Sequence, residues 1–99
     1  METRVVIGLP SFNEADSIQF VTEMVDQIGM FDPKVCVLLN ADSGSTDGTS
    51  KKFLNLPTRC RKEVIDTGEE NRGKGKNLLA IFKWAKQMDA EFVATIDTD

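Results

Sequence analysis

The sequence predicts an α/β fold of the Rossmann-like, three-layer α/β/α type, in which helices cover both faces of a mainly parallel four-stranded sheet. Two observations predict this fold. Short apolar stretches alternate along the chain with longer segments of helical periodicity. The apolar stretches also lack the polar–apolar alternation of half-exposed strands, which is typical of parallel strands buried on both faces.

The predicted elements follow one another in a regular order. The apolar stretches predict strands at residues 4–9, 35–39, 63–66 and 92–96, of which the third is the weakest. The segments between them predict helices at about residues 14–28, 46–55 and 76–88. In the first helix Ile18, Val21, Val25 and Ile28 recur at helical spacing, and Asn13 is a suitable N-cap. In the last helix the residues expected on the packed side are Leu78, Ile81, Phe82 and Ala85.

Length and composition indicate one small globular domain. The chain has 99 residues, and its 12 basic and 16 acidic residues give a net charge of −4, whereas nucleic-acid binders usually carry a basic surplus. No apolar stretch approaches the ~20 residues that a membrane span needs, and no signal-peptide pattern opens the chain. We therefore expect a cytoplasmic protein without a membrane span in this segment, and peripheral membrane association of a longer protein stays open.

The residue types restrict the chemistry that these residues can perform. Histidine and tyrosine are absent, which excludes imidazole base catalysis and a histidine zinc site within the sequence. Neither cysteine suggests a site, because Cys36 lies in an apolar stretch as a small buried residue. Cys60 stands among three cations, which predicts a lowered thiol pKa. The groups that remain for catalysis or ligand binding are carboxylates, lysines, hydroxyl groups and backbone amides.

Polar, loop-forming segments follow each of the four predicted strands. In a parallel sheet the carboxyl ends of the strands lie along one edge, where open α/β sheets bind their ligands, so these segments are expected to converge. They are residues 10–14, 41–49, 71–76 and 97–99. This expected convergence is the main reason for predicting a ligand site.

Asp97 and Asp99 lie in the last of these segments, directly after an apolar strand. Their carboxylates offer hard oxygen ligands, which suit Mg²⁺ or Mn²⁺, and such an ion typically bridges one or two carboxylates to substrate phosphates. The alternative interpretation is that the two acids cap a strand at the surface.

Asp42 is another carboxylate placed where an apolar strand ends, and the base or ribose hydroxyls of a nucleotide are a fitting partner for it. The residues that follow have a simpler interpretation as the start of a helix. In that interpretation Ser45 or Thr46 is the cap, and Asp47 complements the helix dipole.

The glycine–lysine loop before the last helix has the composition of a phosphate-binding turn. Gly73 and Gly75 allow close backbone approach, Lys74 and Lys76 supply ammonium groups, and a helix N-terminus follows. A solvated basic turn is the alternative. The loop also nearly matches a P-loop, because Gly68 stands at the right distance before Gly73 and Lys74, but Gly75 replaces the Ser or Thr that binds Mg²⁺.

Four motifs in this order resemble the nucleotide-binding half of the family 2 glycosyltransferases, which have the GT-A fold. The motifs are residues 10–14, 42–49, 71–76 and 97–99, and the resemblance covers essentially the whole chain. The glycine–lysine–glycine loop is similar to that of the dolichyl-phosphate sugar synthases and of the mannosylglycerate and glucosyl-3-phosphoglycerate synthases. The resemblance implies a UDP- or GDP-linked sugar as the donor and Mg²⁺ or Mn²⁺ as the cofactor.

The resemblance also implies roles for individual residues. The substrate-binding residues would be Pro10, Ser11, Asn13, Glu14, Asp42, Ser43, Gly73, Lys74 and Lys76. Of these, Asp42 would contact the base, while Lys74 and Lys76 would lie near the diphosphate. Asp97 would approach the ribose or the sugar, and Asp99 would hold the metal.

For the fold, the resemblance implies the N-terminal part of a GT-A fold, with the strand order 3-2-1-4. We expect residues 1–99 to be a single nucleotide-binding subdomain of a longer hexosyltransferase, and to transfer no sugar without its acceptor-binding half. The fourth strand would then be a bare apolar edge, which predicts association between copies of the chain. Ser43 departs from the family pattern, because many members have a second aspartate there.

Three other functions stay open. They are a P-loop-like NTPase, a sugar-phosphate nucleotidyltransferase and a binding module without catalysis. A nucleotidyltransferase would carry a glycine- and arginine-rich loop after the first strand, where this chain has residues 10–14 instead. Metal-dependent binding of a nucleoside diphosphate would argue against a module that merely keeps the scaffold.

Overall fold

A computed structural model describes residues 2–28, 32–68 and 74–99 of the chain. The four strands are β1 (Val5–Ser11), β2 (Cys36–Asp42), β3 (Arg61–Asp66) and β4 (Phe92–Thr95). The three helices are α1 (Ala15–Gln27), α2 (Thr49–Asn55) and α3 (Lys74–Gln87). All strand pairs are parallel and the order in the sheet is β3-β2-β1-β4, so the predicted fold class and strand order are confirmed.

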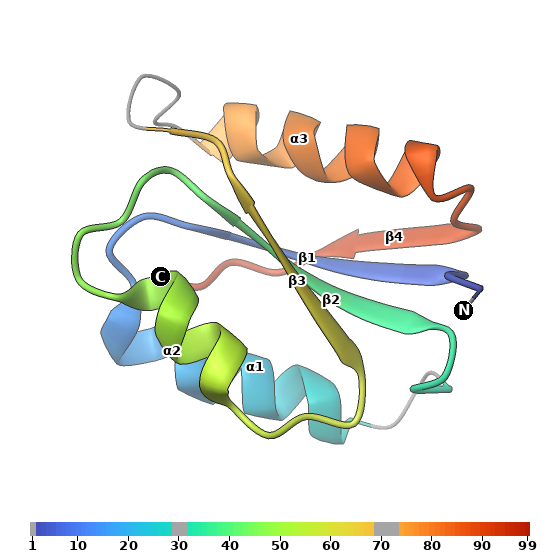
Figure 1. The fold of residues 1–99 in the computed structure, drawn as a ribbon, viewed down its shortest axis with the longest axis horizontal. Coiled ribbons are helices and arrows are strands. Elements are labelled where there is room, and N and C mark those ends of the chain that lie inside the picture. The colour runs from blue at the N-terminus through green and yellow to red at the C-terminus, as the bar shows by residue number, and fades with distance from the viewer. Residues whose placement is uncertain (1, 29–31, 69–73) are drawn as a thin grey trace.

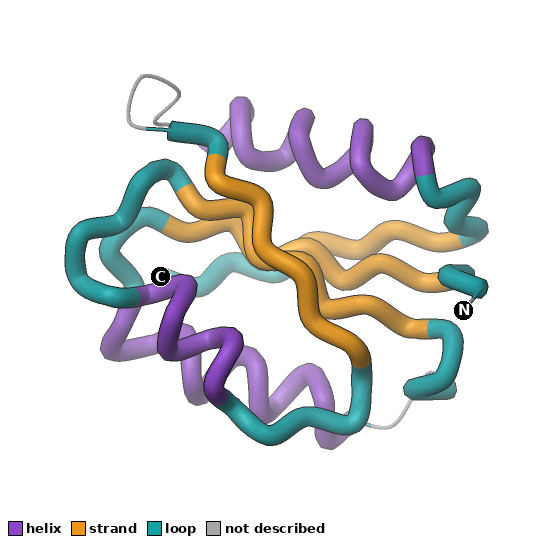
Figure 2. The backbone as a smooth tube through the Cα atoms, viewed as in Figure 1, coloured by secondary structure: helices purple, strands orange, loops and turns teal. Residues whose placement is uncertain are grey.

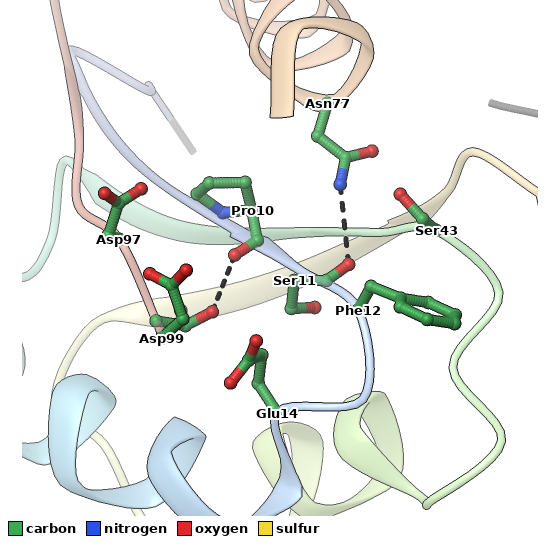
Figure 3. Close-up of a pocket in the computed structure, with 9 residues that line it drawn as sticks. Pro10, Ser11, Phe12, Glu14, Ser43, Asn77, Asp97 and Asp99 are labelled. Carbon is green, nitrogen blue, oxygen red and sulfur yellow. Dashed lines mark hydrogen bonds between the residues drawn. The ribbon is translucent and has the colours of Figure 1, made fainter. Parts of the chain in front are cut away.

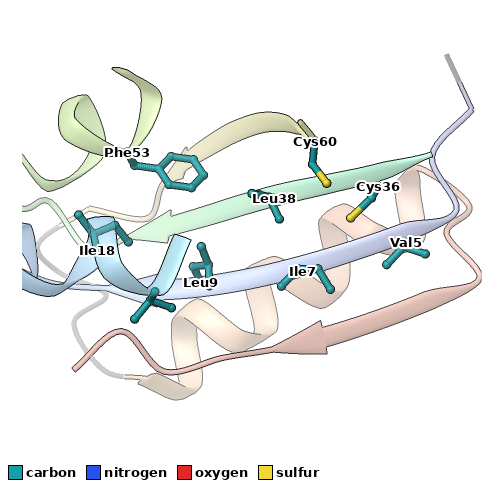
Figure 4. Packing of buried hydrophobic residues seen from close by; sticks show 9 residues of the cluster. Val5, Ile7, Leu9, Ile18, Cys36, Leu38, Phe53 and Cys60 are labelled. Atoms are coloured by element: carbon teal, nitrogen blue, oxygen red, sulfur yellow. The ribbon is translucent and has the colours of Figure 1, made fainter. Parts of the chain in front are cut away.

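The sheet lies between two helical layers, with α1 and α2 on one face and α3 on the other (Figures 1 and 2). Successive residues of β1 point to opposite faces of the sheet, so each layer has its own apolar core. The core under α1 and α2 includes Ile7, Leu9 and Phe53, and Figure 4 shows these side chains pointing into it. The core under α3 includes Val6 and Ile81.

Gly8 sets how closely α3 approaches the sheet. A Cβ atom on Gly8 would lie 2.6 Å from both Cδ1 and Cγ2 of Ile81, which is closer than carbon atoms pack. Because Gly8 has no side chain, Ile81 fits directly onto the backbone of β1. This contact brings the N-terminal turn of α3 toward the carboxyl ends of the strands.

Two strands run further than the hydrophobic pattern predicts. β1 extends to Ser11 and β2 to Asp42, and these two residues are partners in the ladder. Their polar side chains are buried but hydrogen-bonded, since the Ser11 hydroxyl donates to Asp42 Oδ1 at 2.7 Å. Asn40 Nδ2 donates to Leu9 O at 2.9 Å and to Ser11 Oγ at 2.8 Å. Polar residues continue the strands because each finds a partner inside the sheet.

The predicted helix starts are wrong by one to three residues. α1 begins at Ala15 after Glu14, so Asn13 is not its N-cap; Asn13 has a positive φ of 53°. α2 begins at Thr49 instead of residue 46, because Gly48 before it has a left-handed φ of 83°. The packed faces of the first and last helices are also narrower than predicted. Ile28 and Phe82 were both expected to be packed, but they are 54% and 49% exposed.

The prediction of a lowered pKa for Cys60 is wrong. The register that pairs Val37 with Arg61 places Cys60, the residue directly before β3, beside Cys36 of β2, and both thiols are buried (Figure 4). Burial, followed by the interaction with Cys36, raises the pKa of Cys60 to about 12. The Arg59 guanidinium is engaged by Asp26, since its Nη2 donates to Asp26 O and its Nε lies 4.0 Å from Asp26 Oδ2.

Lys62, another of the three cations next to Cys60 in the sequence, stabilises the end of α2. Its ammonium group donates to Phe53 O at 3.0 Å and to Leu54 O at 2.7 Å, and it also contacts Leu56 O. Burial lowers the pKa of Lys62.

Within the described residues, no helix is long and apolar enough to span a membrane.

Candidate functional site

Three of the four polar segments that were predicted to converge, those after β1, β2 and β4, surround one cavity at the carboxyl edge of the sheet (Figure 3). Its volume is about 180 Å³. The lining residues come from the segments after β1, β2 and β4 and from α3, and they are Pro10, Ser11, Phe12, Glu14, Ser43, Asn77, Asp97, Thr98 and Asp99. Six of the predicted site residues therefore lie together: Pro10, Ser11, Glu14, Ser43, Asp97 and Asp99.

Thr98 anchors the acidic segment after β4. It is 2% exposed, and its hydroxyl donates to Pro10 O at 2.7 Å. Its carbonyl oxygen accepts a hydrogen bond from the Ser17 hydroxyl of α1. Ile96 N also donates to Gly8 O at 2.9 Å, so the chain continues along β1 beyond the end of β4. The exposed residues on either side of Thr98, Asp97 and Asp99, are thereby held at the rim of the cavity.

Three carboxylates line the cavity. Figure 3 shows Glu14 reaching up from the start of α1 toward Asp99, with Asp97 on the same rim. In the described part of the chain, no group of three or more His, Cys, Asp or Glu side chains is arranged to enclose a metal ion. The acids fit the other type of magnesium or manganese site, in which one or two carboxylates hold the ion and substrate phosphates complete its coordination.

Asp42 lies behind this cavity instead of on its surface. It is 5% exposed, and its Oδ1 accepts hydrogen bonds from the hydroxyls of Ser11 and Ser45, while Oδ2 accepts from Ser45 N at 2.8 Å. The carboxylate therefore joins the end of β1 to the loop after β2. Ser43, the next residue, is fully buried and does line the cavity.

The loops after β1 and β2 are joined by four further hydrogen bonds from one chain segment to the other. Asn13 N donates to Ser45 Oγ at 2.8 Å, and Thr46 N donates to Asn13 Oδ1 at 2.8 Å. Glu14 N donates to Thr49 Oγ1 at 3.0 Å. Ala15 N donates to Asp47 Oδ2 at 3.0 Å. The position of Glu14 at the cavity thus depends on residues more than thirty positions further along the chain.

Asp47 holds the starts of two helices with one carboxylate. Oδ2 accepts from Ala15 of α1, while Oδ1 accepts from Thr49 N at 3.1 Å and from the Thr49 hydroxyl. Burial acts to raise the pKa of Asp47, but these hydrogen bonds outweigh it and lower the pKa. The predicted helix start with Ser45 or Thr46 as its cap is wrong, because Gly48 is the N-cap of α2. Asp47 precedes that cap and accepts hydrogen bonds from the first N–H groups of both α1 and α2.

Asn77 is a cavity residue that the sequence analysis did not identify. It lies in the first turns of α3 and is 3% exposed. Its Nδ2 donates to Ser11 O at 3.4 Å, as Figure 3 shows, and its Oδ1 accepts from the Thr67 hydroxyl at 2.6 Å. A signal was present, because Asn77 precedes Ile81 and Ala85 by four and eight residues on the buried face of the helix.

The structure does not bring the predicted phosphate-binding lysines into the cavity. Gly73 lies outside the described residues, and Lys74 is described only as the first residue of α3. Lys76 is exposed and lines a shallow hollow with Leu79 and Lys83 instead. The start of α3 does reach the site, because Asn77 lies in the same turn as Lys76.

Comparison with known proteins places this arrangement in a family. The family model described as "Glycosyl transferase family 2" matches residues 6–99. Among solved structures, the chain is similar to the mannosyltransferase PcManGT from Pyrobaculum calidifontis in complex with GDP-Man and Mn2+, with a TM-score of 0.66 and 23% identity. The match covers 86% of this chain and 25% of that one, so this chain spans about a quarter of that mannosyltransferase. Comparison with curated proteins gives no match.

At that identity the likeness to PcManGT shows the fold, which is the N-terminal part of a GT-A fold. The family model covers nearly the whole chain and includes all four polar segments that follow the strands in the sequence. This chain belongs to glycosyl transferase family 2.

Proposed function

We propose that these residues are the donor-binding subdomain of a glycosyltransferase that moves a hexosyl group from a UDP- or GDP-linked sugar to an acceptor. The observation that carries the proposal is the cavity at the carboxyl edge of the sheet, which combines an acidic rim with hydrogen-bonding groups on its wall. Ligands of open α/β sheets bind at this edge. The family match supports the reaction type, and the GDP-Man in the similar mannosyltransferase supports a nucleotide sugar as donor.

In this proposal Asp97 and Asp99 hold Mg²⁺ or Mn²⁺ together with the donor diphosphate. Both carboxylates lie on the rim, and Thr98 between them is anchored to Pro10. The Mn²⁺ in the similar mannosyltransferase supports a divalent metal. When bound, such an ion stabilises the negative charge that develops on the leaving diphosphate.

Asp42 would recognise the nucleoside from behind the cavity wall. A carboxylate has about four acceptor positions. Three are filled by Ser11 Oγ, Ser45 N and Ser45 Oγ, which leaves one position for a donor group of the base. Pro10, Asn13 and Glu14 would complete this nucleoside pocket, as the family pattern implies.

The start of α3 would face the diphosphate. Asn77 places the first turns of this helix at the cavity, and a helix N-terminus favours bound anions through its free N–H groups and its dipole. Gly73, Lys74 and Lys76 precede or begin this turn. A lysine contact with phosphate would add a charge-assisted hydrogen bond worth about 1.5–3 kcal/mol.

Calorimetry with UDP and GDP tests the metal site. We expect tighter binding with Mn²⁺ or Mg²⁺ than with a chelator, and Asp99→Asn should remove most of this difference. Glu91→Gln is the matched control, because it makes the same change of charge at an exposed acid at the other end of β4. Equal affinity in metal and in chelator, or an unaffected Asp99→Asn variant, would contradict the proposal.

Two further measurements separate the alternatives. Lys76→Ala should weaken binding of the diphosphate more than binding of the bare nucleoside, whereas Lys83→Ala, on the same helix, should change neither. Equal losses for diphosphate and nucleoside would assign Lys76 to folding. Hydrolysis of ATP by the chain would favour the P-loop NTPase instead of the glycosyltransferase.

A further inference from the structure

The outer face of α3 carries apolar side chains that no core explains. Asn77, Ile81 and Ala85 point toward the sheet and are buried, whereas Leu79 and Phe82 are 52% and 49% exposed. Helical geometry places Leu79 opposite the buried row and Phe82 on its flank. These two side chains are therefore available to a partner outside the described residues.

Exposed lysines surround these apolar side chains. Lys76, Lys83 and Lys86 are all exposed, and at helical spacing they share the outer side of α3 with Leu79. Lys76 and Lys83 also line a shallow hollow together with Leu79 and Ala80. The face thus combines apolar contact area with long cationic side chains that can keep their charges in water.

The charge of α3 contrasts with the charge of the rest of the molecule. The helix has lysines at positions 74, 76, 83 and 86 and no acidic residue, although the chain as a whole has a net charge of −4. On the opposite face of the sheet, α1 carries Asp16, Glu23 and Asp26 and no basic residue (Figure 1). The charge contrast is therefore between the helices α3 and α1, since α2, which lies on the same face as α1, carries Lys51 and Lys52.

We propose that the outer face of α3 docks onto a lipid bilayer that contains anionic phospholipid. Lysines attract such a surface, and Leu79 and Phe82 supply the apolar side chains that a helix lying at the interface buries among the lipids. Charge complementarity alone would also suit a nucleic acid, but nucleic-acid binding would leave the two exposed apolar side chains without a role. The acidic helix α1 would face away from the bilayer.

This docking surface is separate from the cavity, apart from Lys76. Lys83 and Lys86 follow Asn77, the described residue of α3 that lines the cavity, by six and nine residues, which is about 1.7 and 2.5 helical turns. Changes at Lys83 and Lys86 therefore test the surface without changing the proposed donor site.

The test is co-sedimentation of the 99-residue chain with vesicles of phosphatidylcholine, with and without phosphatidylserine. We expect binding to the mixed vesicles, weak binding to pure phosphatidylcholine, and loss of binding as salt rises. Lys83→Gln with Lys86→Gln should weaken binding about tenfold or more, as expected for two lysines near an anionic surface. Leu79→Ser should weaken it while the salt dependence remains.

The matched control is Lys34→Gln with Lys51→Gln, which removes the same charge from exposed lysines elsewhere. It should bind vesicles like the wild type, and all variants should keep the wild-type circular dichroism spectrum and UDP or GDP affinity. Absence of binding to phosphatidylserine vesicles, or equal loss in the control, would overturn the proposal. Binding of single-stranded RNA without binding of vesicles would assign the face to nucleic acid.

Discussion

The carboxylate of Asp47 accepts a hydrogen bond from the backbone N–H of Ala15, with 3.0 Å between Oδ2 and N. The two residues are 32 positions apart, and the bond connects the loop before α2 to the first turn of α1. Because Asp47 also accepts from Thr49 N, one side chain caps both helices that cover this face of the sheet. Glu14, which lines the cavity, lies directly before the capped residue.

Replacement of Asp47 by alanine should destabilise the protein by about 1–2 kcal/mol near neutral pH, the usual effect of losing a helix N-cap. Both helix starts lose an acceptor in this variant, so the upper end of the range is expected. Urea denaturation followed by circular dichroism measures the change. Asp47→Asn keeps one oxygen acceptor and should lose less than Asp47→Ala; equal losses would show that the hydrogen bonds are not the cause.

The stabilising effect of Asp47 should depend on pH. The hydrogen bonds lower the pKa of the folded-state carboxyl below the ordinary value of 3.8, so the unfolded state takes up its proton first as the pH falls. The stabilisation is then present above that value and is lost as the pH falls through the folded-state pKa. The stability difference between wild type and Asp47→Ala should shrink in acid, and a constant difference would contradict this explanation.

The contact between Gly8 and Ile81 gives a second prediction. Gly8→Ala forces a methyl group to within 2.6 Å of Ile81 and should destabilise the protein by about 1–3 kcal/mol through overpacking. In an Ile81→Ala background the same substitution should have a much smaller effect, which a double-mutant cycle measures. Gly75→Ala is the control, since a Cβ there meets nothing within 4 Å and alanine favours the helix. Equal effects of Gly8→Ala in both backgrounds would exclude a clash with Ile81.

The strands could be predicted from the hydrophobic pattern and their order from the family resemblance, but not all of the strand ends could be predicted. Continuous apolar stretches identify buried parallel strands, and alternation with helices determines the parallel arrangement. The last residues of β1 and β2 were missed because Ser11 and Asp42 are polar residues that usually occur in loops. Their burial depends on a hydrogen bond between two strands, and such pairing over 31 residues has no local pattern.

The candidate site was predictable to a similar extent. Topology alone brings the segments after the strands to one edge, so Glu14, Asp97 and Asp99 were correctly expected to lie near each other. Which of these side chains line the cavity and which are buried behind it was not predictable. Asp42 is buried because Ser11 and Ser45 surround its carboxylate, and Asn77 lies at the cavity one helical turn before Ile81, which packs directly on Gly8.

The buried thiols give a third prediction. Burial raises the pKa of Cys36 and, more strongly, that of Cys60, to about 12, so both remain protonated at mildly alkaline pH. Because the thiolate is the reactive form, a disulfide reagent near pH 8 should label the native protein very slowly and label both thiols once urea unfolds it. Rapid labelling of the native protein, faster than its unfolding, would mean that the thiols are accessible.

The fourth prediction concerns the edge of the sheet at β4. This strand pairs with β1 on one side, and its first residue, Phe92, is 60% exposed. The N–H groups of Phe92 and Ile96 donate to Arg4 O and Gly8 O. Because alternate residues of a strand point their N–H groups to opposite sides, the N–H of Thr95 points away from β1.

An unpaired strand edge of this kind tends to pair with another chain, so we expect residues 1–99 to form dimers or larger species as the concentration rises. Thr95→Pro removes the outward N–H and should reduce self-association, because proline on a strand edge blocks pairing without breaking the inner ladder. Thr95→Val keeps the N–H and should associate at least as strongly as the wild type. Light scattering across a concentration series distinguishes these outcomes, and a wild-type chain that stays monomeric throughout would falsify the edge-pairing prediction.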